Sequence, residues 1–495
     1  MHAPAGRSME PVACSIDTLP RSLLRSLQLS FESDAIHLAR LIFGITELTS
    51  IAERSITSQT PNARSSMDLL PDDMLANVLG RLPPCTLAAS RSVRKNWCAL
   101  IDARRLLRHD LLPLRLDAFF CLADQLDREI YFFSRPSTAR RIGGSLDYFS
   151  DDPYDDVWIK DHCNGLLLLW ERVVNPATRQ WADLPPFPDP ATVGMEGFRQ
   201  HYFLAYDPFL SPHHFDVFCF VIPLRHMIKF EEESEWQPSL YTTHVFSSSK
   251  WRWEERSFLR QGEAAGTIAD MRFTWETRHR HAVYLRGALY VHCQNGSVMR
   301  IILSKDKYQM IKLPAGSQIV HDYDGDVYLG KSEKGVYSAL LWEEENRWPR
   351  CRVWLLNESF GQMEWVLKSD ISLQEVVQNF PYSDDRYSRP WIVNYNNNKK
   401  DMNEAWAEDE FEWDFDNGII LHGTKDKVSP CRGNAVFLGF HPYKEIAFFL
   451  ISNSRAVSYN LNSLKVQELG ILNEQTVVKS FPYTPCRMGE LFENN

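Results

Sequence analysis

The sequence has 495 residues, of which 44% are hydrophobic, 12% aromatic and 24% charged, as in globular proteins with a packed core. This composition excludes a disordered or fibrous chain, and a net charge of −10 at pH 7 gives no electrostatic reason to bind nucleic acid. By the usual domain size the length predicts about three domains, but a single all-β unit can exceed about 250 residues. We therefore expect one small and one large domain.

Cysteine spacing and the N-terminus exclude further classes. The ten cysteines are scattered, without a CxxC pair or the regular spacing of a zinc site or a disulfide framework. The first residues lack the layout of a secretory signal, and no apolar run approaches the roughly 18 residues of a membrane span. We expect a soluble intracellular protein of the cytoplasm, the nucleus or both, with free buried thiols and no metal, cofactor or membrane partner.

Residues 1–66 are interpreted as an N-terminal extension that is partly flexible. The apolar spacing within 35–54 favours a helix, and the Ser-, Thr- and Pro-rich stretch 55–66 is typical of a linker. Nothing in this extension indicates a function.

The stretch 70–101 carries the strongest helical signal. Pro71 suits the first turn of a helix, where its missing N–H would have no partner, and Asp72 and Asp73 place negative charge at the positive end of the helix dipole. Before the prolines at 83 and 84, apolar residues recur at helical spacing: Met74, Leu75, Val78, Leu79 and Leu82. The pattern predicts an amphipathic helix that begins at Pro71 and stops at the two prolines.

A second helix is predicted after the prolines, with Thr86 as its cap. So short a segment lies below the roughly 40-residue floor for a domain that folds unaided, so both apolar faces cannot be buried within it. A partner is expected to cover the excess. The alternative is a helical hairpin that packs on the chain's own C-terminal domain.

This stretch resembles the F-box without a gap. The resemblance implies binding of a Skp-type adaptor, and through it a cullin–RING ubiquitin ligase, by these residues: Leu70, Pro71, Leu75, Val78, Leu79, Leu82, Pro83, Leu87, Val93, Trp97, Leu100 and Ile101. Arg94 departs from the family pattern, which commonly has a cysteine there, so a long cation replaces a small side chain. The F-box module is assigned to residues 67–112.

From residue 117 to 486 the chain reads as an all-β domain. Short runs rich in Val, Tyr, Phe, Trp and Leu alternate with Gly, Asn, Asp or Pro, as in strands joined by turns. Strands are predicted at 119–122, 130–134, 165–170, 171–174, 203–206, 216–222, 241–246, 282–285, 288–292, 298–303, 327–329, 336–342, 352–356, 419–422, 435–440, 446–451 and 456–461.

A repeat runs through this region. A strand, a polar turn and a second strand with an aromatic or apolar anchor recur at 173–185, 245–258, 302–314, 354–368 and 458–470. The steps between anchors approach the roughly 50-residue blade of kelch-like propellers, in which blades stack to bury both of their faces. We expect a mainly β fold with a small α-helical module: F-box helices followed by a degenerate propeller of six or seven blades. A large sandwich or two smaller β domains is the alternative.

The stretch 162–186 also resembles the start of the F-box-associated β region of many plant proteins, and 257–271 and 287–293 are similar to other members of that group. Between 379 and 418 the sequence is polar, then acidic, without a sustained strand pattern, and a long surface loop is predicted.

Residues 325–332 match the phosphate-loop pattern G-x-x-x-x-G-K-S. A working phosphate loop opens a helix, whereas here a strand precedes the second glycine and another strand follows Gly335. We therefore expect a β-hairpin in which Lys331 is a surface charge. No other catalytic motif is present, so the chain is not expected to be an enzyme.

The resemblance implies the substrate-recognition subunit of an SCF-type (Skp adaptor, cullin, F-box) E3 ubiquitin ligase, with an unknown target protein bound by the β domain. One rival is a propeller-fold enzyme or small-molecule sensor with a pocket on the central channel. Another is an F-box protein that binds its target without promoting turnover. The sequence does not identify the target.

Overall fold

The computed structural model describes residues 71–80, 87, 90, 95–104, 106, 115–123, 130–135, 144, 146, 148, 157–188, 198–208, 211, 213–223, 233–268, 282–293, 296–314, 326–332, 334–342, 348–358, 363–380, 391–394, 415, 418–420, 434–452, 454–472 and 477–486. These residues fall into two compact units, helical before Pro113 and mainly β after it. The helical unit contains α4 (Asp72–Leu79) and α6 (Lys95–Ala103).

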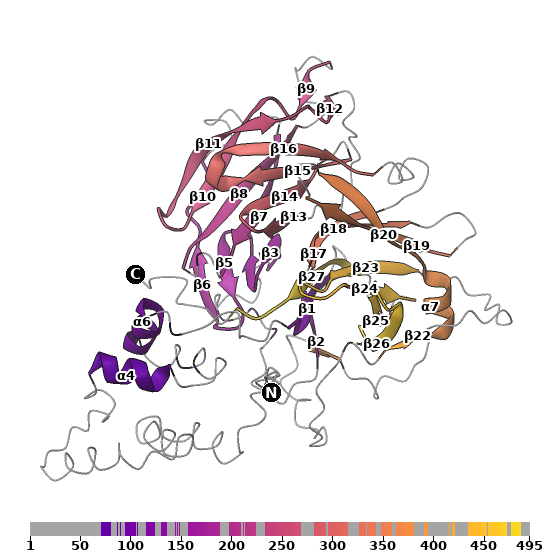
Figure 1. Cartoon of the computed structure of the whole chain (residues 1–495), viewed down its shortest axis with the longest axis horizontal. Coiled ribbons are helices and arrows are strands. Elements are labelled where there is room, and N and C mark those ends of the chain that lie inside the picture. The colour runs from indigo at the N-terminus through magenta and orange to yellow at the C-terminus, as the bar shows by residue number, and fades with distance from the viewer. Residues whose placement is uncertain are drawn as a thin grey trace, which may run out of the picture. The chain divides into compact units, whose positions relative to one another are not determined.

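The β unit is built from antiparallel groups of four strands that follow one another along the chain (Figure 1). The first group contains both ends of the unit and is described after the others. The second group is β3 (Asp161–Cys163), β4 (Leu166–Leu168), β5 (Arg172–Asn175) and β6 (Gln180–Asp183). The third is β7 (Phe198–Tyr206), β8 (Phe215–Pro223), β10 (Leu240–Ser247) and β11 (Arg252–Gln261). The fourth is β13 (Ala282–Leu285), β14 (Ala288–His292), β15 (Ser297–Ile302) and β16 (Lys307–Lys312).

Two further groups complete the order. The fifth is β17 (Asp326–Ser332), β18 (Gly335–Trp342), β19 (Arg350–Asn357) and β20 (Glu364–Ser372), and α7 (Leu373–Asn379) follows it. The sixth is β23 (Ala435–Phe440), β24 (Ile446–Ile451), β25 (Arg455–Asn460) and β26 (Lys465–Ile471), with the short β22 (Ile419–Ile420) at its edge. A separate two-stranded ribbon pairs β9 (Glu235–Trp236) with β12 (Gly266–Thr267), and a 3₁₀ turn, Leu303–Lys305, precedes β16.

The first group joins the two ends of the β unit. Its strands lie in the order β21 (Ile392–Asn394), β2 (Ile130–Ser134), β1 (Ala118–Ala123) and β27 (Val477–Tyr483). The antiparallel β1–β27 pair places Ala118 opposite Tyr483, so residues more than 300 positions apart share one ladder. This pairing fixes the start of the β unit to its end without a covalent link.

Neighbouring groups bury their faces against each other. In β1, Phe119 and Cys121 pack with residues of the sixth group, whereas Phe120 and Leu122 pack with residues of the second group. Successive side chains of a strand point to opposite faces, so both faces of β1 are covered. All six residues of β1 and of β24 are buried, which explains why these strands are apolar throughout and do not alternate.

Each group has one edge strand that we call its first strand: β3, β7, β13, β17 and β23, and β27 for the first group. These strands contact one another in turn, from β3 to β7, β13, β17, β23 and β27. The series returns to its start because His162 of β3 lies edge-on to Phe481 of β27, with ring centroids 5.3 Å apart. The first strands therefore surround a common centre.

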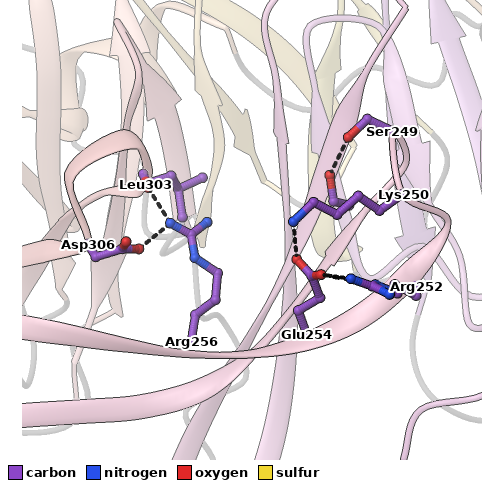
Figure 2. Close-up of polar contacts among 8 residues, drawn as sticks. Ser249, Lys250, Arg252, Glu254, Arg256, Leu303 and Asp306 are labelled. Carbon is purple, nitrogen blue, oxygen red and sulfur yellow. Dashed lines mark hydrogen bonds and ion pairs between the residues drawn. The ribbon is translucent and has the colours of Figure 1, made fainter.

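The third and fourth groups form one eight-stranded sheet through a short parallel pairing of β11 with β16. Its edge strands β7 and β13 also contact each other, so the sheet nearly closes on itself. Figure 2 shows Arg256 of β11 donating to the Leu303 carbonyl and to the Asp306 carboxylate at the start of β16. Arg256 therefore ties together the two groups where they join.

Arg256→Met is expected to lower the free energy of unfolding by about 1 kcal/mol, since it removes a hydrogen bond and a half-exposed ion pair. The matched control is Arg252→Met. Arg252 contacts Glu254 of its own strand in an exposed cluster (Figure 2), and its loss should cost less than about 0.5 kcal/mol. Urea unfolding of both variants tests this, and equal losses would show that the contact does not stabilise the junction.

The predicted repeat is a repeated hairpin. Its five copies are the β5–β6, β10–β11, β15–β16, β19–β20 and β25–β26 hairpins, the third and fourth strands of five groups. In four of them the anchors are Trp181, Trp253, Tyr308 and Val466. A residue with positive φ lies two positions before each of these anchors: Arg179, Trp251, Asp306 and Leu464. A turn that ends in one left-handed residue is a common way to close a short hairpin, so the repeat in the sequence is a repeat of turn geometry.

The prediction of a surface loop over 379–418 is wrong at two places. Trp391 and Phe415 are buried, and their rings lie 6.3 Å apart beside Phe448. Strand β21, which starts one residue after Trp391, pairs with β2. Single aromatic residues in a polar segment give no periodic signal, and remote strands decide whether they are buried. The acidic residues of 401–410 lie outside the described part of the chain.

Candidate functional site

Helix α4 forms as its sequence predicts, shifted by one residue. Pro71 is the N-cap, and its carbonyl accepts the N–H groups of Met74 and Leu75 at 2.9 and 3.0 Å. Asp72 and Asp73 occupy the first turn, where their charge favours the helix dipole. The helix ends at Leu79, before the predicted stop at the two prolines, which lie outside the described residues.

Helices α4 and α6 contact each other, and an exposed ion pair joins Asp73 to Arg104 just after α6. Exposed pairs of this kind contribute about 0–1 kcal/mol, so apolar contacts must supply most of the stability of this unit. Leu79 and Ile101, at 1% and 0% exposure, belong to that interior.

The residues predicted to bind the adaptor divide into three sets. Six are buried within the chain: Leu75, Leu79, Leu87, Trp97, Leu100 and Ile101. Pro71 is exposed and Val78 is partly exposed, and four lie outside the described residues: Leu70, Leu82, Pro83 and Val93. Arg94 is also outside them. The buried six support the helices from within, and a partner can touch the accessible two directly.

Met74 is a further accessible apolar residue on α4, with 42% of its surface exposed. It was part of the predicted apolar stripe but not of the predicted contact set. Together Pro71, Met74 and Val78 form an apolar surface on one helix, which we call the α4 surface. Its spacing was visible in the sequence, but which members of the stripe remain accessible depends on how α6 packs.

The phosphate-loop match lies in a β-hairpin, as predicted. Gly330, Lys331 and Ser332 belong to β17, and Ser332 pairs with Gly335 at the start of β18. Strand β18 therefore follows where a phosphate loop needs a helix N-terminus.

The prediction that Lys331 is a surface charge is wrong. Its ammonium group donates to the Asn164 side chain and lies 3.5 Å from the Tyr284 carbonyl oxygen. Burial lowers its pKa, although the charges of Cys163 and Asp207 act in the opposite direction. The hairpin can be predicted from its own sequence. The environment of Lys331 cannot, because it is formed by β3 and β13, which are distant in the chain.

Lys331 lines a cavity of about 80 Å³ at the centre of the β unit, where the first strands meet. Strands β3, β13, β17, β23 and β27 contribute its walls. Most of the surface is apolar, from residues such as Val283, Leu329 and Phe437. The cavity is several times the roughly 10–15 Å³ needed to hold one water.

A second lysine, a histidine and an aspartate also lie at or beside this cavity. Lys479 lines it and donates to the Lys160 carbonyl at 2.7 Å, and burial lowers its pKa to about 8. His162 lines it with a pKa lowered to about 3, by burial and by the charges of the two lysines. Asp161, which precedes His162 in β3, is not a lining residue. Its carboxylate accepts the Leu204 N–H at 2.7 Å, and burial raises its pKa to about 7.

Other predicted site classes can be compared with the described residues. No group of three or more His, Cys, Asp or Glu that could hold a metal occurs among them. The six cysteines whose side chains the structure describes are free and buried, as predicted. No helix in the described part of the chain is both long and apolar enough to cross a membrane.

The helical unit matches a known protein family. Residues 67–109 match the F-box domain. One solved structure, a putative 6-phosphogluconolactonase from Bacteroides uniformis, aligns with 76% of this chain and 99% of its own at 11% identity. Its TM-score of 0.28 is too low to carry an argument about fold or activity.

Three proteins similar to this chain come from the plant Arabidopsis thaliana. F-box protein At5g07610 of Arabidopsis thaliana is 29% identical over 339 residues, which cover 63% of this chain and 72% of that protein. F-box protein At2g34280 of the same plant is 31% identical over 134 residues, covering 24% and 34%. F-box only protein 8, also from Arabidopsis thaliana, is 25% identical over 160 residues and is covered over half its length. The chain thus carries an F-box domain, and these three relatives are plant F-box proteins.

Proposed function

We propose that this chain is the substrate-recognition subunit of an SCF-type E3 ubiquitin ligase. The observation that carries the proposal is the F-box domain at residues 67–109. An F-box domain implies a Skp-type adaptor, and the adaptor implies a cullin–RING ligase. The chain itself would be non-catalytic.

The α4 surface is where we place direct contact with the adaptor. Pro71, Met74 and Val78 are accessible apolar residues on a helix whose other apolar side is buried. The rest of the predicted contact set would either support these helices or extend the surface. We keep 67–112 as the F-box module, 1–66 as an extension and 117–486 as the β domain.

For the β domain we propose a kelch-like propeller of six blades. Six groups of four antiparallel strands, contact between successive first strands and a first group that joins the two ends of the unit support it. Each group would be one blade, with the eight-stranded sheet counted as two. Loops at the ends of the blades would bind the target protein.

The proposed mechanism is proximity. A target held on the β domain would present its lysines to a ubiquitin-carrying enzyme at a raised effective concentration. The energy of target binding is then used for positioning, while the partner enzymes supply the chemistry.

Co-expression of the full chain with a Skp-type adaptor tests the proposal. We expect an equimolar complex that co-elutes in gel filtration and that recruits a cullin–RING pair. Proximity labelling with the proteasome blocked should then enrich target proteins, and ubiquitin on those targets should decrease when the chain is depleted. A folded full chain that fails to bind any Skp-type adaptor would contradict the proposal. Targets that bind but keep their ubiquitin level would favour a role without turnover.

A further inference from the structure

The central cavity of the β unit carries positive charge on apolar walls. Lys331 of β17 and Lys479 of β27 both line it, and the aspartates that influence them are not among the lining residues. Within the described residues, neither lysine forms an ion pair with a carboxylate, and each donates to neutral oxygen atoms. Two cations therefore line one cavity without a counter-ion in its wall.

Burial makes this arrangement unfavourable for an empty cavity. An ammonium group removed from water loses hydration, and a low-dielectric wall strengthens the repulsion between like charges. Burial is the cause that lowers the pKa of both lysines, whereas Asp207 acts in the opposite direction on Lys331 and Asp161 does so on Lys479. An anion in the cavity would reverse both effects, because it would favour the charged form of each lysine.

His162 offers a third polar group. Its Nδ1 is buried and has no hydrogen-bond partner within the described part of the chain. The imidazole is neutral at physiological pH because its pKa is about 3, so it provides one donor and one acceptor. Since its Nδ1 remains unpaired in the protein alone, a ligand that hydrogen-bonds to it would gain from doing so.

The remaining wall selects against a purely inorganic ion. Val283 of β13, Leu329 of β17, Phe437 of β23 and Val477 of β27 line the same cavity. A hydrated ion would leave these side chains in contact with water, whereas an apolar body would cover them.

We propose that this cavity binds a small organic carboxylate, with its anionic group on Lys331 and Lys479 and its apolar part against the valine, leucine and phenylalanine side chains. The β domain would then be a small-molecule receptor as well as the proposed target-binding domain. The site lies within the β unit and does not depend on the adaptor-binding proposal, so its test needs no adaptor.

Butyrate is a suitable probe because it combines a carboxylate with a short apolar chain. Calorimetric titration and thermal shift of the full chain should show saturable binding of butyrate at constant ionic strength. Butyramide, which has nearly the same shape without the charge, should bind at least tenfold more weakly. Inorganic phosphate, an anion without an apolar body, should also bind at least tenfold more weakly.

Variants identify the site. Lys331→Met and Lys479→Met should each weaken butyrate binding at least tenfold, while Lys250→Met, an exposed lysine of the β10–β11 turn, should bind like the wild type. Both cavity variants remove a half-buried cation that has no ion-paired carboxylate among the described residues, so their melting temperatures without ligand should not fall. If one of them does not fold, the other carries the test. No saturable binding, equal binding of butyramide, a preference for phosphate, or unchanged affinity in a folded cavity variant would each overturn the proposal.

Discussion

Leu79→Arg is expected to abolish binding to a Skp-type adaptor while the β unit stays folded. Leu79 is 1% exposed, in the interior of the helical unit. An unpaired cation there costs several kcal/mol, compared with about 8 to 12 kcal/mol for typical specific binding. Pull-down with the adaptor measures the loss, and the thermal transition of the β unit should be unchanged. Wild-type recovery of the adaptor would contradict the assignment of these helices.

Because Leu79 is buried, its replacement acts through the packing of α4 as well as through the binding surface. Met74→Arg separates the two effects, since Met74 is 42% exposed and its side chain can leave without opening the interior. It should weaken adaptor binding at least tenfold, about 1.4 kcal/mol, with helical content unchanged. Asn96→Arg places the same cation at an exposed polar position of α6 and should bind normally. Equal adaptor affinities for the two variants would show that the α4 surface is not part of the adaptor interface.

Glu445→Gln is expected to lower the stability of the β unit at pH 7 by about 3 kcal/mol, because it breaks a buried charge network. The Glu445 side chain is 2% exposed and lies between the fifth and sixth groups. It accepts hydrogen bonds from Lys334 at 2.8 Å and Tyr337 at 2.6 Å, and from Asn462, and Lys368 is 3.3 Å away.

The same contacts predict a pH dependence. Burial by itself would raise the pKa of Glu445, but the hydrogen bonds from Lys334, Tyr337 and Asn462 and the charge of Lys368 outweigh it and lower the pKa from 4.5 to about 2. A carboxylate whose pKa is lower in the folded state stabilises the fold above its unfolded pKa. This stabilisation should be complete above pH 4.5 and be lost as the pH falls toward 2.

Urea unfolding of wild type and Glu445→Gln between pH 2 and 7 measures both effects. The two proteins should differ most at pH 7 and converge at the acidic end. Glu254→Gln is the matched control, since Glu254 also accepts from two cations but in an exposed cluster (Figure 2), and its change should be much smaller. A constant difference across the whole range would show that the charge of Glu445 is not the cause.

Local signals in the sequence were sufficient for the helices and hairpins. Apolar spacing and two early aspartates predicted α4 to within one residue at its start. Strands β13, β14, β23 and β24 have the predicted bounds, because apolar runs between turn residues mark strands without knowledge of their partners. The F-box pattern belongs to the same class of signal, since it lies within one contiguous stretch.

Strands without such a signal were missed. β3 has three residues, Asp161, His162 and Cys163, and two of them are polar or charged. Its place as the first strand of its group depends on pairing with β4 and on contact with β7. Short polar strands have too little pattern of their own, so their assignment depends on neighbours that are distant in sequence.

The sequence by itself therefore determined the F-box segment, the all-β character of the rest and the hairpin that contains the phosphate-loop match. Only the tertiary structure decided which residues meet. Lys331 and Lys479 are 148 positions apart, and both line one cavity because β17 and β27 are first strands around the same centre. Glu445 is likewise joined to Lys334 across two sheets. Periodicity reports the environment of a residue along its own element, whereas burial and electrostatic partners arise from packing between elements.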